Sequence, residues 1–229
     1  MQTIVLWDID NTLLYTGGAG GIGMNRAFRD LYGVDDGFGR VEFSGRSDAA
    51  IFADAARAHG VAEDQLLVER ARFLDAYIPH LHTAMSEATS GRLMPGVVEL
   101  LRALDARDDV VQGLGTGNFR RAGELKLQHY EIAGYFPGCV GGFGEDSEHR
   151  HELIGAGIDR LRNGDSGARV VIIGDTPHDV SAAKANDAFA LAVATGRDSV
   201  EELLACGADA ALADLSDVEH AVAIICGSG

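Results

Sequence analysis

The stretch IVLWDIDNT, residues 4–12, decides the fold of this chain. Its first four residues are apolar and rich in strand-forming types, so they predict a short buried strand. Asp8 and Asp10 follow directly, at the point where that strand ends. Ligands of open α/β sheets bind at the carboxyl ends of the strands. Two carboxylates at this edge repel each other, so they indicate a site that holds a cation.

The rest of the chain alternates strand-like and helix-like segments. Further strands are predicted at 110–115, 170–173, 191–193 and 210–212, and helices at 97–106, 120–131, 151–161, 179–185, 199–205 and 218–225. The predicted strands are apolar on both faces, which is typical of a parallel sheet covered by helices. The predicted fold class is therefore α/β, with a Rossmann-like parallel sheet as its core.

Residues 16–93 interrupt this alternation. They contain no convincing strand, and apolar residues recur at helical spacing over 22–32, 48–59 and 63–85. Glycines at 17–21 mark the entrance and 90–96 the exit, so we interpret them as a hinge and flap. The segment 18–23 fits G-x-G-x-x-G, but it does not directly follow the strand, which argues against a dinucleotide site. We predict a catalytic core at 1–15 and 94–229, with a helical cap at 16–93.

Composition excludes several classes of partner. The chain has 229 residues and a formal net charge of −16, which disfavours nucleic acid and anionic membranes. No apolar run is long enough to span a bilayer, and the N-terminus lacks the features of a signal peptide. Three widely spaced cysteines indicate neither a zinc site nor a disulfide framework. We expect a cytoplasmic protein, monomeric or homodimeric.

Other polar residues follow the remaining predicted strands. Asp175 and Asp179 form a second acidic pair after strand 170–173, and the two pairs together suit Mg²⁺. Thr116, Gly117 and Asn118 lie between strand 110–115 and the next helix, where backbone N–H groups can bind phosphoryl oxygens. Arg150 begins another helix and can supply a fixed positive charge.

These segments, taken in order, resemble the motifs of the haloacid dehalogenase-like hydrolase superfamily, in the branch with a helical cap after the first motif. The resemblance rests on DIDNT at 8–12, Thr116, Arg150 and GDTPHD at 174–179, and it covers nearly the whole chain. Asn11 stands where the family commonly has glycine, and Arg150 where it usually has lysine. The cap position and FSGRSD at 43–48 are most similar to phosphoglycolate phosphatase-like members.

The resemblance implies a mechanism. Asp8 would attack phosphorus and form an aspartyl-phosphate, while Asp10 would protonate the leaving alcohol and later deprotonate water. Mg²⁺ would be bound by Asp8, the backbone carbonyl of Asp10, Asp175 and a phosphate oxygen. The expected substrate is a small phosphorylated metabolite, either phosphoglycolate-like or a sugar phosphate.

The remaining site residues receive supporting roles. Thr116, with Gly117 and Asn118, would hold phosphoryl oxygens, and Arg150 would stabilise charge in the transition state. Asp179 would act through water or by orienting Arg150. Arg46 in the cap is either a ligand for a substrate carboxylate or part of a salt bridge within the cap.

Four alternative functions remain to be weighed. Dehalogenases of this superfamily lack the second aspartate, so Asp10 disfavours that activity. A phosphonate hydrolase needs a lysine in the cap, and residues 16–93 contain none. A phosphorylated signalling domain would not carry so large a helical insertion. A phosphosugar mutase shares Asp8 and Asp10, and it stays open as an alternative.

Overall fold

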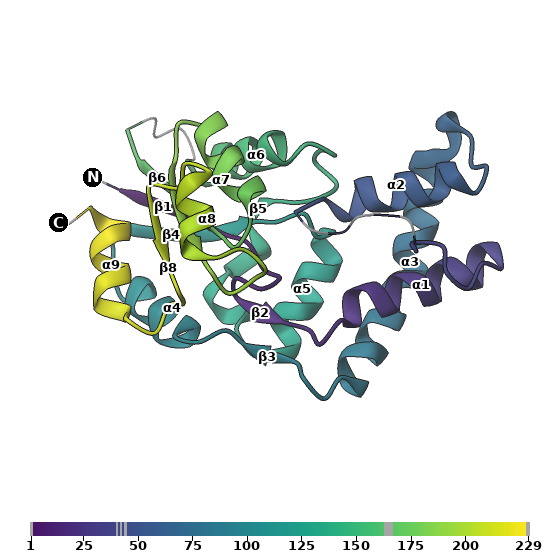
Figure 1. The fold of residues 1–229 in the computed structure, drawn as a ribbon, viewed down its shortest axis with the longest axis horizontal. Helices are drawn as coiled ribbons and strands as arrows, with labels where there is room; N and C mark the ends of the chain where they lie inside the picture. Colours follow the sequence, from purple (N-terminus) through teal and green to yellow (C-terminus); the bar gives the residue numbers. More distant parts are fainter. Residues whose placement is uncertain (1, 40, 42, 44, 163–166, 228–229) are drawn as a thin grey trace.

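In the computed structural model, which describes residues 2–39, 41, 43, 45–162 and 167–227, six parallel strands form one sheet (Figure 1). Their spatial order is β5 (Gly141–Gly142), β4 (Val110–Gly115), β1 (Thr3–Trp7), β6 (Arg169–Gly174), β7 (Phe189–Val193) and β8 (Ala210–Leu212). Every neighbouring pair is parallel. The predicted α/β class and parallel core are therefore confirmed. Of the six strands in this sheet, β5 alone was not predicted, because two glycines carry no periodic signal.

Helices cover both faces of this sheet. Helices α4 (Val97–Asp105) and α9 (Val218–Cys226) pack on one face, and α6 (Arg150–Arg162), α7 (Pro177–Ala185) and α8 (Val200–Ala205) pack on the other. Strand β1 contributes to both layers, because successive side chains point to opposite faces. Its Val5 and Trp7 lie in the first layer, and its Ile4 and Leu6 lie in the second.

The central position of β1 brings the polar strand ends together. Trp7 is in register with Leu114 of β4 and with Ile173 of β6. The backbone N–H of Asp8 donates to the carbonyl of Ile173 at 2.9 Å. Residues that follow these three strands therefore meet at one edge of the sheet, although they are far apart in the chain.

The inserted segment is a helical cap. It contains α1 (Ala19–Tyr32), α2 (Asp48–Ala58), a 3₁₀ turn at Glu63–Gln65 and α3 (Leu66–Glu87), and it extends to one side of the core in Figure 1. Its apolar core is separate from the two layers of the sheet and is rich in aromatic rings, including Phe28, Phe52 and Phe73. Helix α5 (Arg120–His129), which follows β4 in the α/β core, contributes Ala122 to this cluster, and Phe119 just before the helix also packs there. Two further 3₁₀ turns, Ala133–Tyr135 and Pro137–Cys139, follow α5.

Two details of the predicted cap are wrong. Residues 16–93 do contain a strand, because β3 (Arg92–Leu93) pairs antiparallel with β2 (Leu14–Tyr15) at the base of the cap. The glycines at 17–21 are not all hinge residues: α1 already begins at Ala19, so Gly20 and Gly21 are helical. Gly18 has a φ of 84°, a conformation that glycine adopts without strain, and it forms the turn before α1.

Domain boundaries at residues 16 and 93 stay a prediction, with the β2–β3 pair lying at this junction. Among the described helices, none combines the length and apolar character needed to cross a bilayer. Ser44 of the FSGRSD motif lies outside the described residues.

Candidate active site

Three carboxylates from two strand ends form a buried cluster. Asp8 follows β1, Asp175 follows β6, and Asp179 lies in the first turn of α7. One carboxylate oxygen from each lies within 4.8 Å of the others, and all three residues are buried. Oxygen ligands at this spacing suit a hard divalent cation such as Mg²⁺. The cluster therefore has the donor set of a metal site.

Electrostatics support a cation in this cluster. Burial raises the pKa of Asp8 to about 6, although the Arg150 guanidinium opposes the rise. Burial, together with the nearby charges of Asp8 and Asp179, raises the pKa of Asp175 to about 8. The hydroxyl of Thr12 donates to Asp175 at 3.3 Å, but no cationic side chain is recorded in an ion pair with this carboxylate among the described residues. A divalent cation would balance this buried charge.

Arg150 binds two members of the cluster from the start of α6. Its Nη2 lies 2.9 Å from Asp8 and also contacts Asp179. The Nε of Arg150 is buried without a hydrogen-bond partner among the described residues, so this guanidinium is only partly satisfied. Asp179 is itself fixed by a capping box at the start of α7, where the Thr176 hydroxyl donates to it at 2.7 Å. Arg150 thus joins Asp8 to a rigid helix start.

A tight turn follows Asp8 and Asp10. Asn11 has a φ of 60°, in the left-handed region that asparagine tolerates better than most residues. This conformation explains why asparagine can stand where glycine is common. The turn is closed by the backbone N–H of Asn11, which donates to the carbonyl of Leu14 at 2.7 Å. The Thr195 hydroxyl, from the loop after β7, donates to the carbonyl of Asn11 at 2.5 Å.

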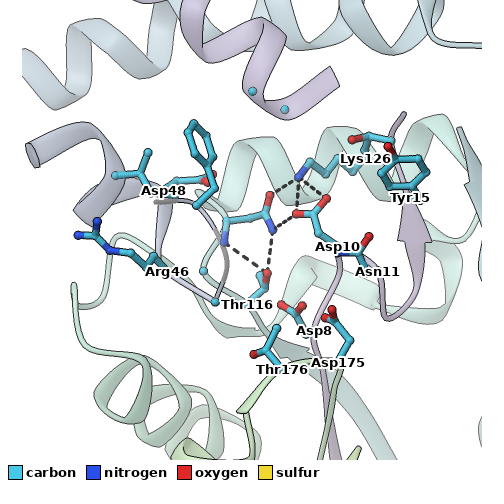
Figure 2. A pocket seen from close by; sticks show the side chains of 18 of the residues that line it. Asp8, Asp10, Asn11, Tyr15, Arg46, Asp48, Thr116, Lys126, Asp175 and Thr176 are labelled. Atoms are coloured by element: carbon cyan, nitrogen blue, oxygen red, sulfur yellow. Dashed lines mark hydrogen bonds and ion pairs between the residues drawn. The ribbon is translucent and has the colours of Figure 1, made fainter. Parts of the chain in front are cut away.

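Asp10 belongs to a second polar network, on the side of the site that faces α5. Lys126 of α5 lies with its Nζ 2.8 Å and 2.6 Å from the two carboxylate oxygens of Asp10. Asn118 donates its side-chain amide to Asp10 and to the Thr116 hydroxyl, at 2.8 Å in each case. Figure 2 shows Lys126 facing Asp10, with Asp8 and Asp175 beside each other elsewhere in the pocket.

The cap meets the core at the loop after β4. The backbone N–H of Asp48, the first residue of α2, donates to the Gly117 carbonyl at 2.7 Å, and its carboxylate accepts from the Phe119 N–H at 2.9 Å. Burial raises the pKa of Asp48 to about 7, although Lys126 opposes the rise. A Cβ at Gly117 would lie only 2.6 Å from the Arg46 carbonyl oxygen. Glycine at this position therefore lets the cap backbone lie directly against the loop after β4.

A cavity of about 260 Å³ lies between the cap and the core and joins these groups. Its core lining includes Asp8, Asp10, Thr116 and Arg150, and its cap lining includes Arg46, Asp48 and Tyr77. A partly open cavity of this size suits a small molecule whose reacting atom lies beside Asp8.

Comparison with known families decides the identity. A family model described as haloacid dehalogenase-like hydrolase matches residues 3–187, which is most of the chain. The chain belongs to this family. Its helical cap, inserted between β2 and β3, is the cap expected for it. No match was found among curated protein sequences.

Solved structures share the fold of this hydrolase at low sequence identity. A protein from Clostridium acetobutylicum, described as a predicted phosphatase, has 18% identity and a TM-score of 0.69, with 97% of this chain and 98% of that chain covered. CbbY from Rhodobacter sphaeroides, in complex with phosphate, has 18% identity and a TM-score of 0.67, covering 95% and 96%. A Thermotoga maritima protein provisionally named a beta-phosphoglucomutase has 20% identity and a TM-score of 0.60, covering 97% and 98%.

The structure brings most of the site residues predicted from the sequence around one cavity. The residues concerned are Asp8, Asp10, Thr116, Gly117, Asn118, Arg150, Asp175 and Asp179, all of which line the cavity. Arg46 also lines it, but its guanidinium pairs with Asp54 at 2.7 Å, which is the salt bridge within the cap that the sequence left open. The roles assigned to these residues stay predictions.

Two residues of the site in this hydrolase were missed by sequence reasoning, the buried Lys126 and the half-buried Asp48. Lys126 received no role in the predicted site, and Asp48 appeared only as part of the FSGRSD segment. A lysine on the buried face of an amphipathic helix was a usable signal, because lysine is rarely buried unless it is paired. No local pattern could have revealed Asp48, since its partner at Phe119 lies 71 residues away.

Proposed function

We propose that this hydrolase is a magnesium-dependent phosphatase that acts on a small phosphate monoester through an aspartyl-phosphate on Asp8. One observation carries the proposal. The Asp8 carboxylate lines a partly open cavity, together with acidic residues that could hold a cation, a buried arginine and a second carboxylate, Asp10. This set suits attack on a phosphoryl group, because the substrate's negative charge must be neutralised.

The residues that would hold Mg²⁺ are Asp8 and Asp175, with the backbone carbonyl of Asp10. The raised pKa of Asp175 means that its charged form is costly without a cation, which fits such an ion, and all three carboxylates of the cluster offer hard oxygen donors. When bound, Mg²⁺ reduces the repulsion between the nucleophile and the phosphoryl oxygens. Asp179 keeps its contact with Arg150, which positions the guanidinium.

Two chemical steps follow from this arrangement. First, an Asp8 oxygen bonds to phosphorus, the bond from phosphorus to the ester oxygen breaks, and Asp10 gives its carboxyl proton to the leaving oxygen. Second, water bonds to phosphorus and gives a proton back to Asp10, and the bond to Asp8 breaks to release inorganic phosphate. Arg150 and the N–H groups after Thr116 stabilise the phosphoryl oxygens in both steps.

The second carboxylate favours phosphoryl transfer over dehalogenation, since a leaving halide needs no proton. The phosphosugar mutase shares Asp8 and Asp10, and one structure with the same fold carries such a name. In a mutase the aspartyl-phosphate passes to a second sugar hydroxyl instead of to water. Product analysis therefore separates the two activities.

The test is a phosphate-release screen over small phosphorylated metabolites, with Mg²⁺ present and with excess chelator. We expect turnover of at least one substrate, its loss in chelator, and a phosphoryl group on the peptide that contains Asp8. Asp8→Asn should lower kcat at least about 10³-fold, because an amide cannot attack phosphorus. Asp198→Asn, which alters another acidic residue of the same cavity, is the matched control.

Three results would contradict the proposal. The first is activity of Asp8→Asn within about tenfold of the unmodified protein. The second is full activity in excess chelator. The third is interconversion of sugar phosphates without net release of phosphate, which would establish the mutase.

A further inference from the structure

Among the lysines and arginines in the described part of the chain, Lys126 is the most deeply buried one outside the cluster of Asp8, Asp175 and Asp179. Its side chain is 3% exposed, and its Nζ contacts Asp10 and Asn118. Lysine is almost never buried to this degree unless it is paired, because desolvating the ammonium costs several kcal/mol. Such a pair is weak evidence for stability, since apolar residues of similar volume usually serve as well. The placement of Lys126 therefore points to a role at Asp10.

Lys126 and Asn118 hold Asp10 from one side, and we call these two residues the cradle of Asp10. Lys126 reaches both carboxylate oxygens, at 2.8 Å and 2.6 Å, and donates to the Asn118 side-chain oxygen at 2.5 Å. A lysine can only donate, so this bond fixes which end of the Asn118 amide faces Lys126. The opposite end then donates to Asp10 and to the Thr116 hydroxyl. Both cradle residues thus hold Asp10 in one orientation.

Asp10 is nevertheless open to the cavity. Its side chain is 41% exposed, while those of Asp8 and Asp179 are 9% and 4% exposed. The cap wall lies close to the cradle on the opposite side, since a Cβ on Gly20 would be in van der Waals contact with the Lys126 Nζ at 3.9 Å and with the Tyr77 hydroxyl at 3.7 Å. One side of Asp10 is therefore held by the protein, and the other is available to a leaving alcohol or to water.

We propose that Lys126, together with Asn118, is a positioning residue that orients the Asp10 carboxyl group for proton transfer. This inference rests on the proposed phosphatase function. Lys126 acts through Asp10 and has no ammonium hydrogen to spare for the phosphoryl group, since its three contacts use its three donors. Arg150 is the cation that serves the nucleophile, and Lys126 is the cation that serves the acid and base.

The two roles of Asp10 give a specific readout. The value of kcat/KM reports the steps up to departure of the alcohol, where Asp10 acts as an acid. An alkyl phosphate needs that proton, whereas an aryl phosphate with an acidic phenol leaves readily without it. Hydrolysis of the aspartyl-phosphate needs Asp10 as a base for every substrate. Loss of positioning should therefore depend on the leaving group in kcat/KM.

The experiment compares Lys126→Met, Asp10→Asn and the double variant on an alkyl phosphate and an aryl phosphate, with Mg²⁺ present. We expect Lys126→Met to lower kcat/KM on the alkyl phosphate about 10²-fold, the lower end of general acid catalysis, and to affect the aryl phosphate far less. In the Asp10→Asn background, Lys126→Met should have no further effect, because its target is already lost. Lys184→Met is the control, since Lys184 pairs with Asp209 outside the cavity.

Several outcomes would overturn the inference. Equal losses on both substrates, or effects that add in the double variant, would assign Lys126 to phosphate binding or to the fold. Unchanged kinetics in Lys126→Met, with normal turnover by the unmodified protein, would refute the positioning role and leave the phosphatase proposal intact. No turnover of any phosphate in the full screen by the unmodified protein would overturn both. If Lys126→Met does not fold, Lys126→Gln is compared on the same two phosphates instead, because its amide keeps a hydrogen-bond donor without the positive charge.

Discussion

Binding of Mg²⁺ by this hydrolase should tighten as the pH rises, because Asp175 must release a proton before it binds the ion. Burial and the charges of Asp8 and Asp179 raise the pKa of Asp175 to about 8. Near pH 7, about nine in ten metal-free molecules therefore carry a proton on Asp175. Metal ligands bind in the deprotonated form, so the dissociation constant should fall about tenfold between about pH 7 and about pH 9. This difference corresponds to about 1.4 kcal/mol.

Stability without the metal should follow the opposite trend. An unfolded aspartate releases its proton near pH 4, whereas folded Asp175 keeps it until about pH 8. The folded state thus binds more protons in this window, and its free energy of unfolding should decrease as the pH rises through it. Saturating Mg²⁺ should remove most of this decrease, because the bound ion replaces the proton.

Isothermal titration calorimetry at the two pH values measures the affinity directly. Titrations in buffers of different ionisation enthalpy give the number of protons released, which should approach one near pH 7 and zero near pH 9. Asp198→Asn, which changes an acidic residue of the same cavity outside the cluster, should keep this behaviour. A dissociation constant that is equal at the two pH values, or binding without proton release near pH 7, would refute the reasoning.

The remaining predictions concern Arg150 and helix α1. Arg150→Ala should lower kcat/KM about 30- to 10³-fold for every phosphorylated substrate, because it removes a buried charged donor beside Asp8. Arg150→Lys should recover part of this loss, since an ammonium keeps the charge but lacks the planar, forked donors of a guanidinium. A kcat/KM for Arg150→Ala within about threefold of the unmodified protein would contradict the transition-state role of Arg150. Gly23→Ala should lower the free energy of unfolding, since its Cβ would lie 3.0 Å from the Leu81 backbone and overpacking costs about 1–3 kcal/mol. Gly20→Ala is the control: its Cβ would meet nothing closer than 3.7 Å, so its free energy of unfolding, measured by urea denaturation, should rise by up to about 1 kcal/mol. If Gly20→Ala were destabilised and Gly23→Ala unaffected, close packing of α1 on α3 would not be the reason.

The sequence by itself determined the core fold and the chemistry of the strand ends. Short apolar strands alternate with amphipathic helices, and each signal lies within one segment, so local periodicity was enough to predict them. Parallel strands bring their carboxyl ends to one edge, which is why the sequence alone predicts that Asp8, Thr116 and Asp175 share one site. Strands of two residues, such as β3 and β5, carry no such period and were missed.

Only the tertiary structure decided which charged groups pair inside the site. Lys126 meets Asp10 across 116 residues of chain, and Asp48 meets Phe119 across 71, so neither contact leaves a local pattern. The salt bridge of Arg46 likewise depended on the position of Asp54 on the folded α2. Burial and neighbouring carboxylates also raise the pKa values of Asp175 and Asp48, which depends on the packing of the folded chain. A sequence gives the residue types at the sheet edge, but the packing of cap on core sets their partners and their dielectric surroundings.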